Sequence, residues 1–238
     1  MTRACSGHRS RYTPAASAME DLHPSQLEAA LEEMPLFPLT QVVLFPHALL
    51  PLHVFEPRYR ALVKDCLTSH KIFAIALVTD PSDVDARGNP PIASVAGIGL
   101  IVEHDALPDG RSTLVLHGQA RVKLEELPFV APYRRARATV LRELEVEVSA
   151  SDRLALLTSA TAFSAEVQKQ DARFSFRLPS QLSGGALADH CAHHLLVDTS
   201  VRQALLGELD PRERVRTVTT ELALQHAALL RETGGVLH

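Results

Sequence analysis

"PLFPLTQVVLFPHALLPLHVFEPRY", residues 35–59, combines many apolar side chains with prolines that stand too close together for a helix. Each proline lacks a backbone donor and biases the residue before it away from the α region. The prolines therefore divide the stretch into short extended pieces. Two of these pieces, 41–45 and 48–50, are apolar at successive positions, as in strands buried on both faces or in edge strands that bend around a core. The stretch predicts the first strands of a barrel-like sheet.

The pattern becomes helical at the last proline of this stretch. Pro57 fits the first helical position, where a missing N–H leaves no hydrogen bond unmade. The apolar residues that follow recur at i, i+3, i+4 and i+7, which places them on one helical face. They are Tyr59, Leu62, Val63 and Cys66. A short helix is therefore expected between the first strands and the later ones.

Strand patterns continue up to residue 145, so about six strands are expected in this half. Gly97 and Gly99 mark a bulge or a bend in one of them. The turn signal LPDG, residues 107–110, joins that strand to the next in a hairpin. The later strands are predicted at 71–78, 92–107, 112–127 and 133–145.

From Ser149 onward the periodicity is helical. The last helix has a strong start signal, with Asp210 as N-cap, Pro211 at the first position and Glu213 three residues after the cap. The first helix of this half carries Leu154, Leu157, Thr161, Ser164 and Val167 on one face, with Leu156, Ala160 and Phe163 beside them.

A β-rich half followed by a helical half predicts an α+β fold with a barrel lobe and a helical-bundle lobe. The expected divisions are a disordered tail at 1–24, a short helix at 25–33, a β-rich lobe at 34–147 and a helical lobe at 148–238.

Composition and charge argue against several classes of partner. The formal net charge of −4 over 238 residues gives no basic face for a nucleic-acid backbone. No apolar run approaches the roughly 18 residues that a membrane-spanning helix needs. The three cysteines form no CxxC pair, and their odd number favours free thiols in a reducing compartment. We expect a cytoplasmic protein that binds neither nucleic acid nor membrane, with its start at Met1 or Met19.

Three blocks of sequence carry a resemblance to a known family: residues 35–67, 97–127 and 187–215. They resemble the N-terminal, substrate-binding domain of the ATP-dependent protease Lon, a family that also occurs as free-standing bacterial proteins and in cereblon. The resemblance extends over residues 34–230. It implies a PUA-like β pseudo-barrel with one inserted helix, packed against a helical bundle. It also implies a role in holding protein substrates for degradation.

The sequence shows no counterpart of Lon's ATPase and peptidase modules. An ATPase of that type needs a Gly-rich phosphate loop that ends in Gly-Lys-Ser/Thr, and none of the 11 glycines precedes a lysine. The Ser-Lys peptidase module of Lon lies beyond the region of resemblance. We therefore expect no enzymatic activity and no cofactor.

Two clusters could support other chemistry. His190 and His194, at i and i+4, could face one metal ion, but no second pair of ligands is evident nearby. Cys66 or Cys191 could act as a nucleophile with His70 as its base. Both cysteines occupy apolar helix faces, where buried thiols are inert. The structural interpretation is favoured for both clusters.

A run of arginines could be interpreted as a patch for RNA. Charged residues on an exposed edge strand are the favoured interpretation, because such charges block aggregation. Acidic residues follow at once and offset the local charge. The arginines are Arg134, Arg135 and Arg137, and the acidic residues are Glu143, Glu145 and Glu147.

The proline-rich stretch supplies the candidate binding surface. An edge strand that is not fully paired leaves apolar side chains and backbone groups for an extended guest. The competing interpretation, that these residues fill the barrel core, is favoured by the usual burial of large apolar side chains. The candidates are Phe37, Leu39, Phe45 and Leu52.

Two functions from different classes follow from these patterns. The favoured one is a non-catalytic module that binds exposed apolar segments of proteins, working with a protease or a chaperone. The alternative is an enzyme or small-ligand binder that reuses the barrel. That alternative predicts a closed polar pocket near His104 or His117.

Overall fold

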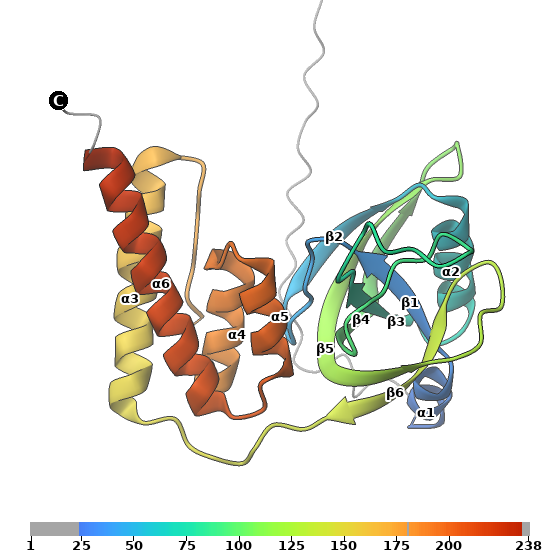
Figure 1. Ribbon diagram of the computed structural model, residues 1–238, viewed down its shortest axis with the longest axis horizontal. Helices are drawn as coiled ribbons and strands as arrows, with labels where there is room; N and C mark the ends of the chain where they lie inside the picture. Colours follow the sequence, from blue (N-terminus) through green and yellow to red (C-terminus); the bar gives the residue numbers. More distant parts are fainter. Residues whose placement is uncertain (1–23, 180, 235–238) are drawn as a thin grey trace, which may run out of the picture.

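The computed structural model describes residues 24–179 and 181–234, in which strands gather in one lobe and most helices in another (Figure 1). The tail predicted at 1–24, with its alternative starts, lies outside these residues apart from Pro24. Within them, the expected six strands with one inserted helix are confirmed, as is the α+β fold class. In chain order the elements are α1 (Pro24–Glu32), β1 (Met34–Leu39), β2 (Leu49–Val54), α2 (Pro57–Thr68), β3 (Ile72–Leu77), β4 (Val95–Ala106), β5 (Ser112–Glu126), β6 (Arg135–Leu141), α3 (Ala150–Gln170), α4 (Gly184–Leu195), α5 (Thr199–Gly207) and α6 (Pro211–Gly234).

The strands close into a ring. The sheet order is β2-β5-β4-β3-β1-β6, and β6 pairs with β5 as well. Besides its pairing with β4, β5 is long enough for two further partners: Ser112 to His117 pairs with β2, and Arg121 to Glu126 pairs with β6. The bulge predicted near Gly99 is present in β4. β5, β4, β3, β1 and β6 therefore form a closed barrel, and β2 is an additional edge strand.

Alternate residues of the ring strands point into the barrel and form one apolar cluster. Many of them are alanines, so the narrow ring can close without voids or overlap. Ala30, Leu27 and Leu31 of α1 pack against this cluster and cover one end of the barrel. The strand residues of the cluster are Met34, Leu36, Ile72, Ala74, Ala76, Ala96, Ile98, Val122, Leu124, Ala136 and Ala138.

Helix α2 packs on the outer face of the barrel. Pro57 begins the helix, and its four buried residues are those that the helical spacing predicts. Tyr59 stacks on Phe37 of β1, with ring centroids 4.2 Å apart. Cys66 Sγ donates a hydrogen bond to the backbone oxygen of Ile72. One face of α2 is thus fixed against the barrel, and the opposite face is left at the surface.

The proline-rich stretch forms strands only partly where they are predicted: most of 48–50 lies in β2, which begins at Leu49. Residues 41–45 form no strand, and β1 includes Pro35 and Pro38 instead. β6 pairs only with the first two residues of β1, so most of β1 has a ladder partner on one side. A proline is tolerated there because one edge of the strand needs no donor.

The loop after β1, residues 42–48, lies across the outside of the barrel. Gly118 of β5 exchanges two backbone hydrogen bonds with this loop, each 2.8 Å long. A Cβ on Gly118 would overlap the carbonyl group of Phe45, and a Cβ on Gly97 would overlap that of Leu44. Glycine is therefore required at both positions for the loop to approach the sheet.

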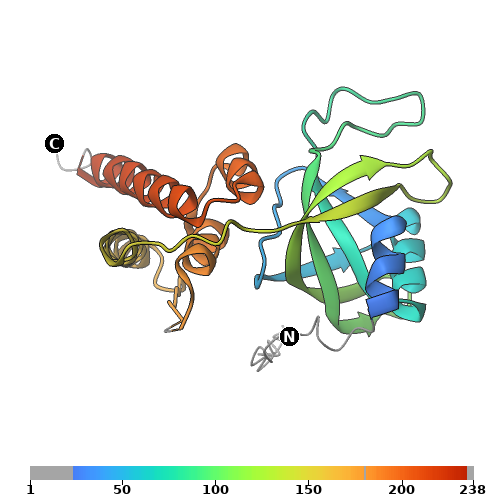
Figure 2. The same ribbon diagram turned by 90° about the horizontal axis from the view of Figure 1, so that it is seen from below.

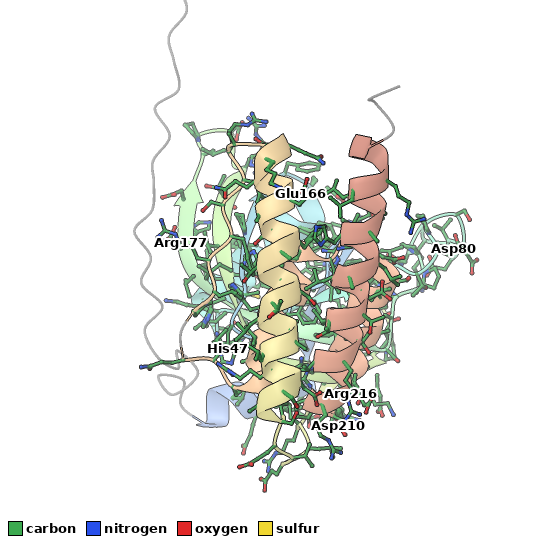
Figure 3. All side chains as sticks on the ribbon, turned by 90° about the vertical axis from the view of Figure 1, so that its left-hand side faces the viewer. His47, Asp80, Glu166, Arg177, Asp210 and Arg216 are labelled. Carbon is green, nitrogen blue, oxygen red and sulfur yellow. The ribbon has the colours of Figure 1, made fainter. Side chains whose placement is uncertain are left out.

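The helical lobe is built on α3 and α6, which lie side by side (Figure 3). Asp210 and Arg216 are labelled there near the start of α6. The predicted start is confirmed: Pro211 is the first residue of α6, and Asp210 Oδ1 accepts a hydrogen bond from the Arg212 N–H at 2.8 Å.

The buried face of α3 is one of the two neighbouring faces that the sequence pattern indicates. α3 buries Leu156, Ala160 and Phe163, whereas Leu154 is 64% exposed. The two faces are neighbours on the helix, and both carry apolar residues at helical spacing. Packing against α6 determines which face is buried, and the periodicity of α3 gives no information about where α6 lies.

The lobes are joined by an extended segment between β6 and α3 (Figure 2) and by a buried ionic network. Glu143 on that segment and Asp189 on α4 meet Arg121 of β5 and Arg214 of α6. Arg121 Nη2 lies 2.5 Å from Asp189 Oδ1, and Arg214 Nη2 lies 2.5 Å from Glu143 Oε1. The two arginines and Asp189 are almost completely buried. The network fixes the helical lobe to the barrel.

Candidate functional site

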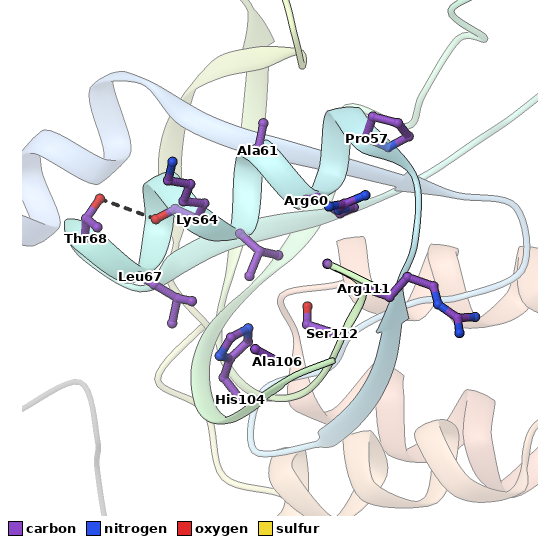
Figure 4. A pocket seen from close by; sticks show the side chains of 12 residues that line it. Pro57, Arg60, Ala61, Lys64, Leu67, Thr68, His104, Ala106, Arg111 and Ser112 are labelled. Carbon is purple, nitrogen blue, oxygen red and sulfur yellow. Dashed lines mark hydrogen bonds between the residues drawn. The ribbon is translucent and has the colours of Figure 1, made fainter. Parts of the chain in front are cut away.

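A groove runs between the surface face of α2 and the end of the β4–β5 hairpin (Figure 4). We call it the α2 groove; it is open and has a volume of about 630 Å³. Ala61, Val63 and Leu67 of α2 and Ala106 of β4 provide its apolar lining. An open apolar groove of this kind can take an extended chain.

The polar lining of the α2 groove is basic. Arg60 and Lys64 stand one turn apart on α2, and the hairpin contributes a third basic lining residue, Arg111. Arg111 forms an ion pair with Asp109, in which Arg111 Nη2 lies 2.6 Å from Asp109 Oδ2. Arg60 and Lys64 form no ion pair within the residues that the structure describes. Helical periodicity places Arg60, Ala61, Lys64 and Leu67 on one face of α2, but it does not indicate that the hairpin stands opposite.

A second groove, which we call the β2 groove, lies on the other face of the same hairpin. Its volume is about 330 Å³. Because side chains alternate along a strand, His104 and Ala106 line the α2 groove, whereas Glu103 and Asp105 line the β2 groove. Leu52 on the edge strand β2 lines this acidic groove.

The four predicted binding residues do not form one surface. Phe37 lies beneath α2 and is 5% exposed, and Phe45 is 0% exposed, with its ring 6.4 Å from that of His193. These two residues therefore belong to the core, as the competing interpretation expects, because neither side chain can be reached by a guest in this conformation. Leu39 and Leu52 are half-buried, and peptide binding at them stays a prediction.

Residues 33–223 match the family described as ATP-dependent protease La (LON) substrate-binding domain. The chain belongs to this family. The match begins just before β1 and ends within α6, so it includes both grooves and both lobes of the Lon-type domain. The family that the sequence resembles is thus confirmed.

Curated relatives are much longer proteins. The Lon protease of Roseiflexus castenholzii is 32% identical over 211 residues, which are 83% of this chain and 25% of the relative. The Lon protease of Dictyoglomus thermophilum is 25% identical over 210 residues, which are 84% of this chain and 25% of the relative. The chain therefore spans about a quarter of their length, and the family match covers the substrate-binding domain without an ATPase or peptidase region.

Solved structures show the same fold. A Lon N-terminal domain protein from Xanthomonas campestris superimposes with a TM-score of 0.59 at 24% identity, covering 79% of this chain and 97% of that one. The N-terminal domain of Mycobacterium avium complex Lon protease gives a TM-score of 0.57 at 16% identity, covering 81% and 98%. The expected barrel with an inserted helix, followed by a helical lobe, is confirmed.

The described helices and the arginine run bear on the expected partners. None of the helices in residues 24–179 and 181–234 is both long enough and apolar enough to cross a membrane. Each arginine of the run forms an ion pair, although the partners are not the glutamates that follow it in sequence. The pairs are Arg134 with Glu126, Arg135 with Glu33 and Arg137 with Glu32.

The two cysteines are unsuited to nucleophilic catalysis. Cys66 and Cys191 are buried free thiols, and burial raises the pKa of each to about 12. A thiol with such a pKa stays protonated at neutral pH and is a poor nucleophile. His70, the base considered for them, accepts a hydrogen bond from the backbone N–H of Ile72 through Nδ1.

The histidines considered for a metal site lie together on α4. The rings of His190 and His194 are 4.6 Å apart, and Phe176 lies against both. Within the described residues, no group of three or more histidine, cysteine, aspartate or glutamate side chains is arranged to hold a metal ion. The apolar contact with Phe176 indicates a packing role.

His193 on the same helix should make stability depend on pH. Burial, and then the charge of Arg202, lower its pKa to about 4. A histidine whose pKa is lower in the folded state is fully stabilising above its unfolded pKa of about 6.5, and that stability is lost as the pH falls toward about 4. We expect His193→Phe to reduce the loss of unfolding free energy between pH 7.5 and pH 4.5 by about 2 kcal/mol. Urea titrations at the two pH values measure it, and an equal loss in the variant and the wild type would contradict the assignment.

Proposed function

We propose that this Lon-type domain binds exposed apolar segments of other proteins in the α2 groove and catalyses no reaction on them. The observation that supports this most directly is an open, apolar-lined groove on a chain of the substrate-binding family. The groove is open to solvent, so a segment within a longer chain can enter without its termini. This property suits capture of unfolded proteins.

Each apolar contact contributes only a small part of the binding free energy. Burying apolar surface contributes roughly 25 cal/mol per Å², and ordering a flexible guest offsets part of that gain. The alanine and leucine side chains that line the groove do not select for one particular shape of guest side chain. We therefore expect micromolar affinity and broad selectivity for apolar or aromatic side chains.

The partners follow from the same proposal. The relatives named Lon protease carry the matched domain within chains about four times as long. We propose that this chain acts in proteolysis or quality control and delivers captured segments to a separate protease or chaperone. The buried free thiols of Cys66 and Cys191 support a reducing compartment such as the cytoplasm.

The test is binding of the purified protein to an array of unrelated peptides and to one chemically unfolded protein, with ATP and zinc as separate additions. We expect capture of apolar segments at micromolar concentration and no effect of either addition. Ala106→Arg places a long charged side chain in the α2 groove and should weaken peptide binding about tenfold or more.

Two further variants locate the site. Ala155→Arg puts the same side chain at an exposed position of α3 and should bind like the wild type. Leu52→Ser alters the β2 groove and tests one of the four binding residues predicted from sequence. Loss of binding in Leu52→Ser with full binding in Ala106→Arg would move the site to the β2 groove. No capture of any peptide by the wild type would refute the function.

A further inference from the structure

A separate cavity of about 200 Å³ lies where the first turn of α2 meets β1 and the loops that precede β4 and β6. It is smaller and more enclosed than the two grooves. We call it the arginine pocket, after three of the residues that line it. Its polar lining residues are Arg58, Tyr59, Arg87, Asn89, Tyr133 and Arg134.

Tyr59 has a polar atom without a partner in this pocket. The residue is 6% exposed, and its hydroxyl group forms no hydrogen bond within residues 24–179 and 181–234 but remains accessible from the pocket. Burial raises the pKa of the phenol, and the nearby charges of Arg58, Glu56 and Arg134 also act on it. The hydroxyl group is therefore a neutral donor among the charged groups of the pocket. Because the hydroxyl group is accessible from the pocket and makes no hydrogen bond within the described residues, a ligand there can accept one from it.

The charge of the lining is positive. Arg58 and Arg134 each pair with a carboxylate, Glu56 and Glu126, but neither carboxylate lines the pocket. The guanidinium group of Arg87 lies 5.4 Å from the centre of the Phe129 ring and forms no ion pair among the described residues. Guanidinium groups bind carboxylate and phosphate oxygens with matched geometry.

Tyr133 adds rigidity instead of a free donor. Its hydroxyl group donates to Asp65 at 2.8 Å and accepts from Arg135 at 3.4 Å. Tyr59 is held from behind by the stacked ring of Phe37. The groups that would meet a ligand are thus positioned in advance, which limits the entropy lost on binding.

We propose that the arginine pocket binds a small oxyanion, a phosphate or carboxylate group, that accepts hydrogen bonds from Tyr59 and Arg87. The volume of about 200 Å³ corresponds to about seven water molecules at roughly 30 Å³ each, enough for one such group with a small attached moiety. Phe129 offers an apolar wall for that moiety. The site is distinct from the α2 groove, so it can fail while the proposed peptide binding holds.

Calorimetric titration with inorganic phosphate and, separately, with benzoate tests the proposal at constant ionic strength. We expect saturable binding of at least one probe with a Kd near or below about 1 mM. Tyr59→Phe removes one oxygen atom and keeps the stacked ring, so it should weaken binding about tenfold while leaving the melting temperature unchanged or higher. Arg87→Gln should weaken binding by a similar factor.

Arg60→Gln is the matched control because Arg60 lies in the α2 groove, outside the arginine pocket. It should bind both probes like the wild type. Saturable binding of phosphate alone or benzoate alone would identify which oxyanion source the pocket accepts. The proposal is overturned if neither probe saturates, or if Tyr59→Phe and Arg87→Gln bind as tightly as the wild type.

Discussion

Asp189→Asn should lower the free energy of unfolding by about 3 kcal/mol or more, because it leaves two buried guanidinium groups with too little negative charge. Asp189 Oδ1 lies 2.5 Å from Arg121 Nη2 and 3.2 Å from Arg214 Nε. Glu143 remains, but its side chain is 39% exposed and cannot replace the buried carboxylate. Since these groups come from both lobes, the loss should affect the attachment of the helical lobe to the barrel.

Glu32→Gln is the matched control for this change. It neutralises the carboxylate of an exposed ion pair, in which Arg137 Nε lies 3.0 Å from Glu32 Oε2. Exposed pairs contribute about 0.2–1 kcal/mol, so this variant should be nearly as stable as the wild type. Urea unfolding measures both variants. Equal stability of Asp189→Asn and Glu32→Gln would show that the buried network is not needed for stability.

Gly118→Ala should lower the free energy of unfolding by about 2–3 kcal/mol, the upper part of the range of about 1–3 kcal/mol for overpacking a well-packed site. The new Cβ would overlap the carbonyl group of Phe45. That obstacle is backbone, which cannot move aside as a flexible side chain can. The loop at 42–48 would have to withdraw and break its two hydrogen bonds to Gly118.

Gly207→Ala provides the comparison at a glycine in open space. Gly207 is an exposed residue at the end of α5, and a Cβ there would meet nothing within 4 Å. Alanine is favoured over glycine in a helix by up to about 1 kcal/mol, so this variant should be neutral or slightly stabilised. Thermal and urea unfolding of both variants measure the two changes in stability. A stable Gly118→Ala protein would mean that the loop adopts another path in solution.

Helix α2 carries two candidate sites because its faces are used separately. Its first turn contributes Arg58 and Tyr59 to the arginine pocket, and its surface face contributes Arg60 and Lys64 to the α2 groove. Peptide binding and oxyanion binding can therefore be removed one at a time by single substitutions. Simultaneous titrations would reveal whether either ligand changes the affinity for the other.

Little of the candidate site could be predicted from sequence. The surface face of α2 follows from its periodicity, but the hairpin that completes the groove is more than thirty residues away in the chain. The arginines of the pocket come from α2 and from two loops, none of which shows a local motif. Phe37 and Phe45 were candidates for binding because they are large and apolar, and the same property places them in the core.

Local sequence patterns determined the elements of this protein: the helix start at Pro57, the buried face of α2, the hairpin after β4 and the start of α6 at Pro211. These features depend on backbone chemistry and on spacing within a few residues, which a sequence states directly. Tertiary structure alone decided that 41–45 is a loop, which face of α3 is buried, and that Arg121, Glu143, Asp189 and Arg214 meet between the lobes. Those outcomes depend on which distant surfaces come into contact, and the burial of charge and apolar area that selects them exists only once the whole chain has folded.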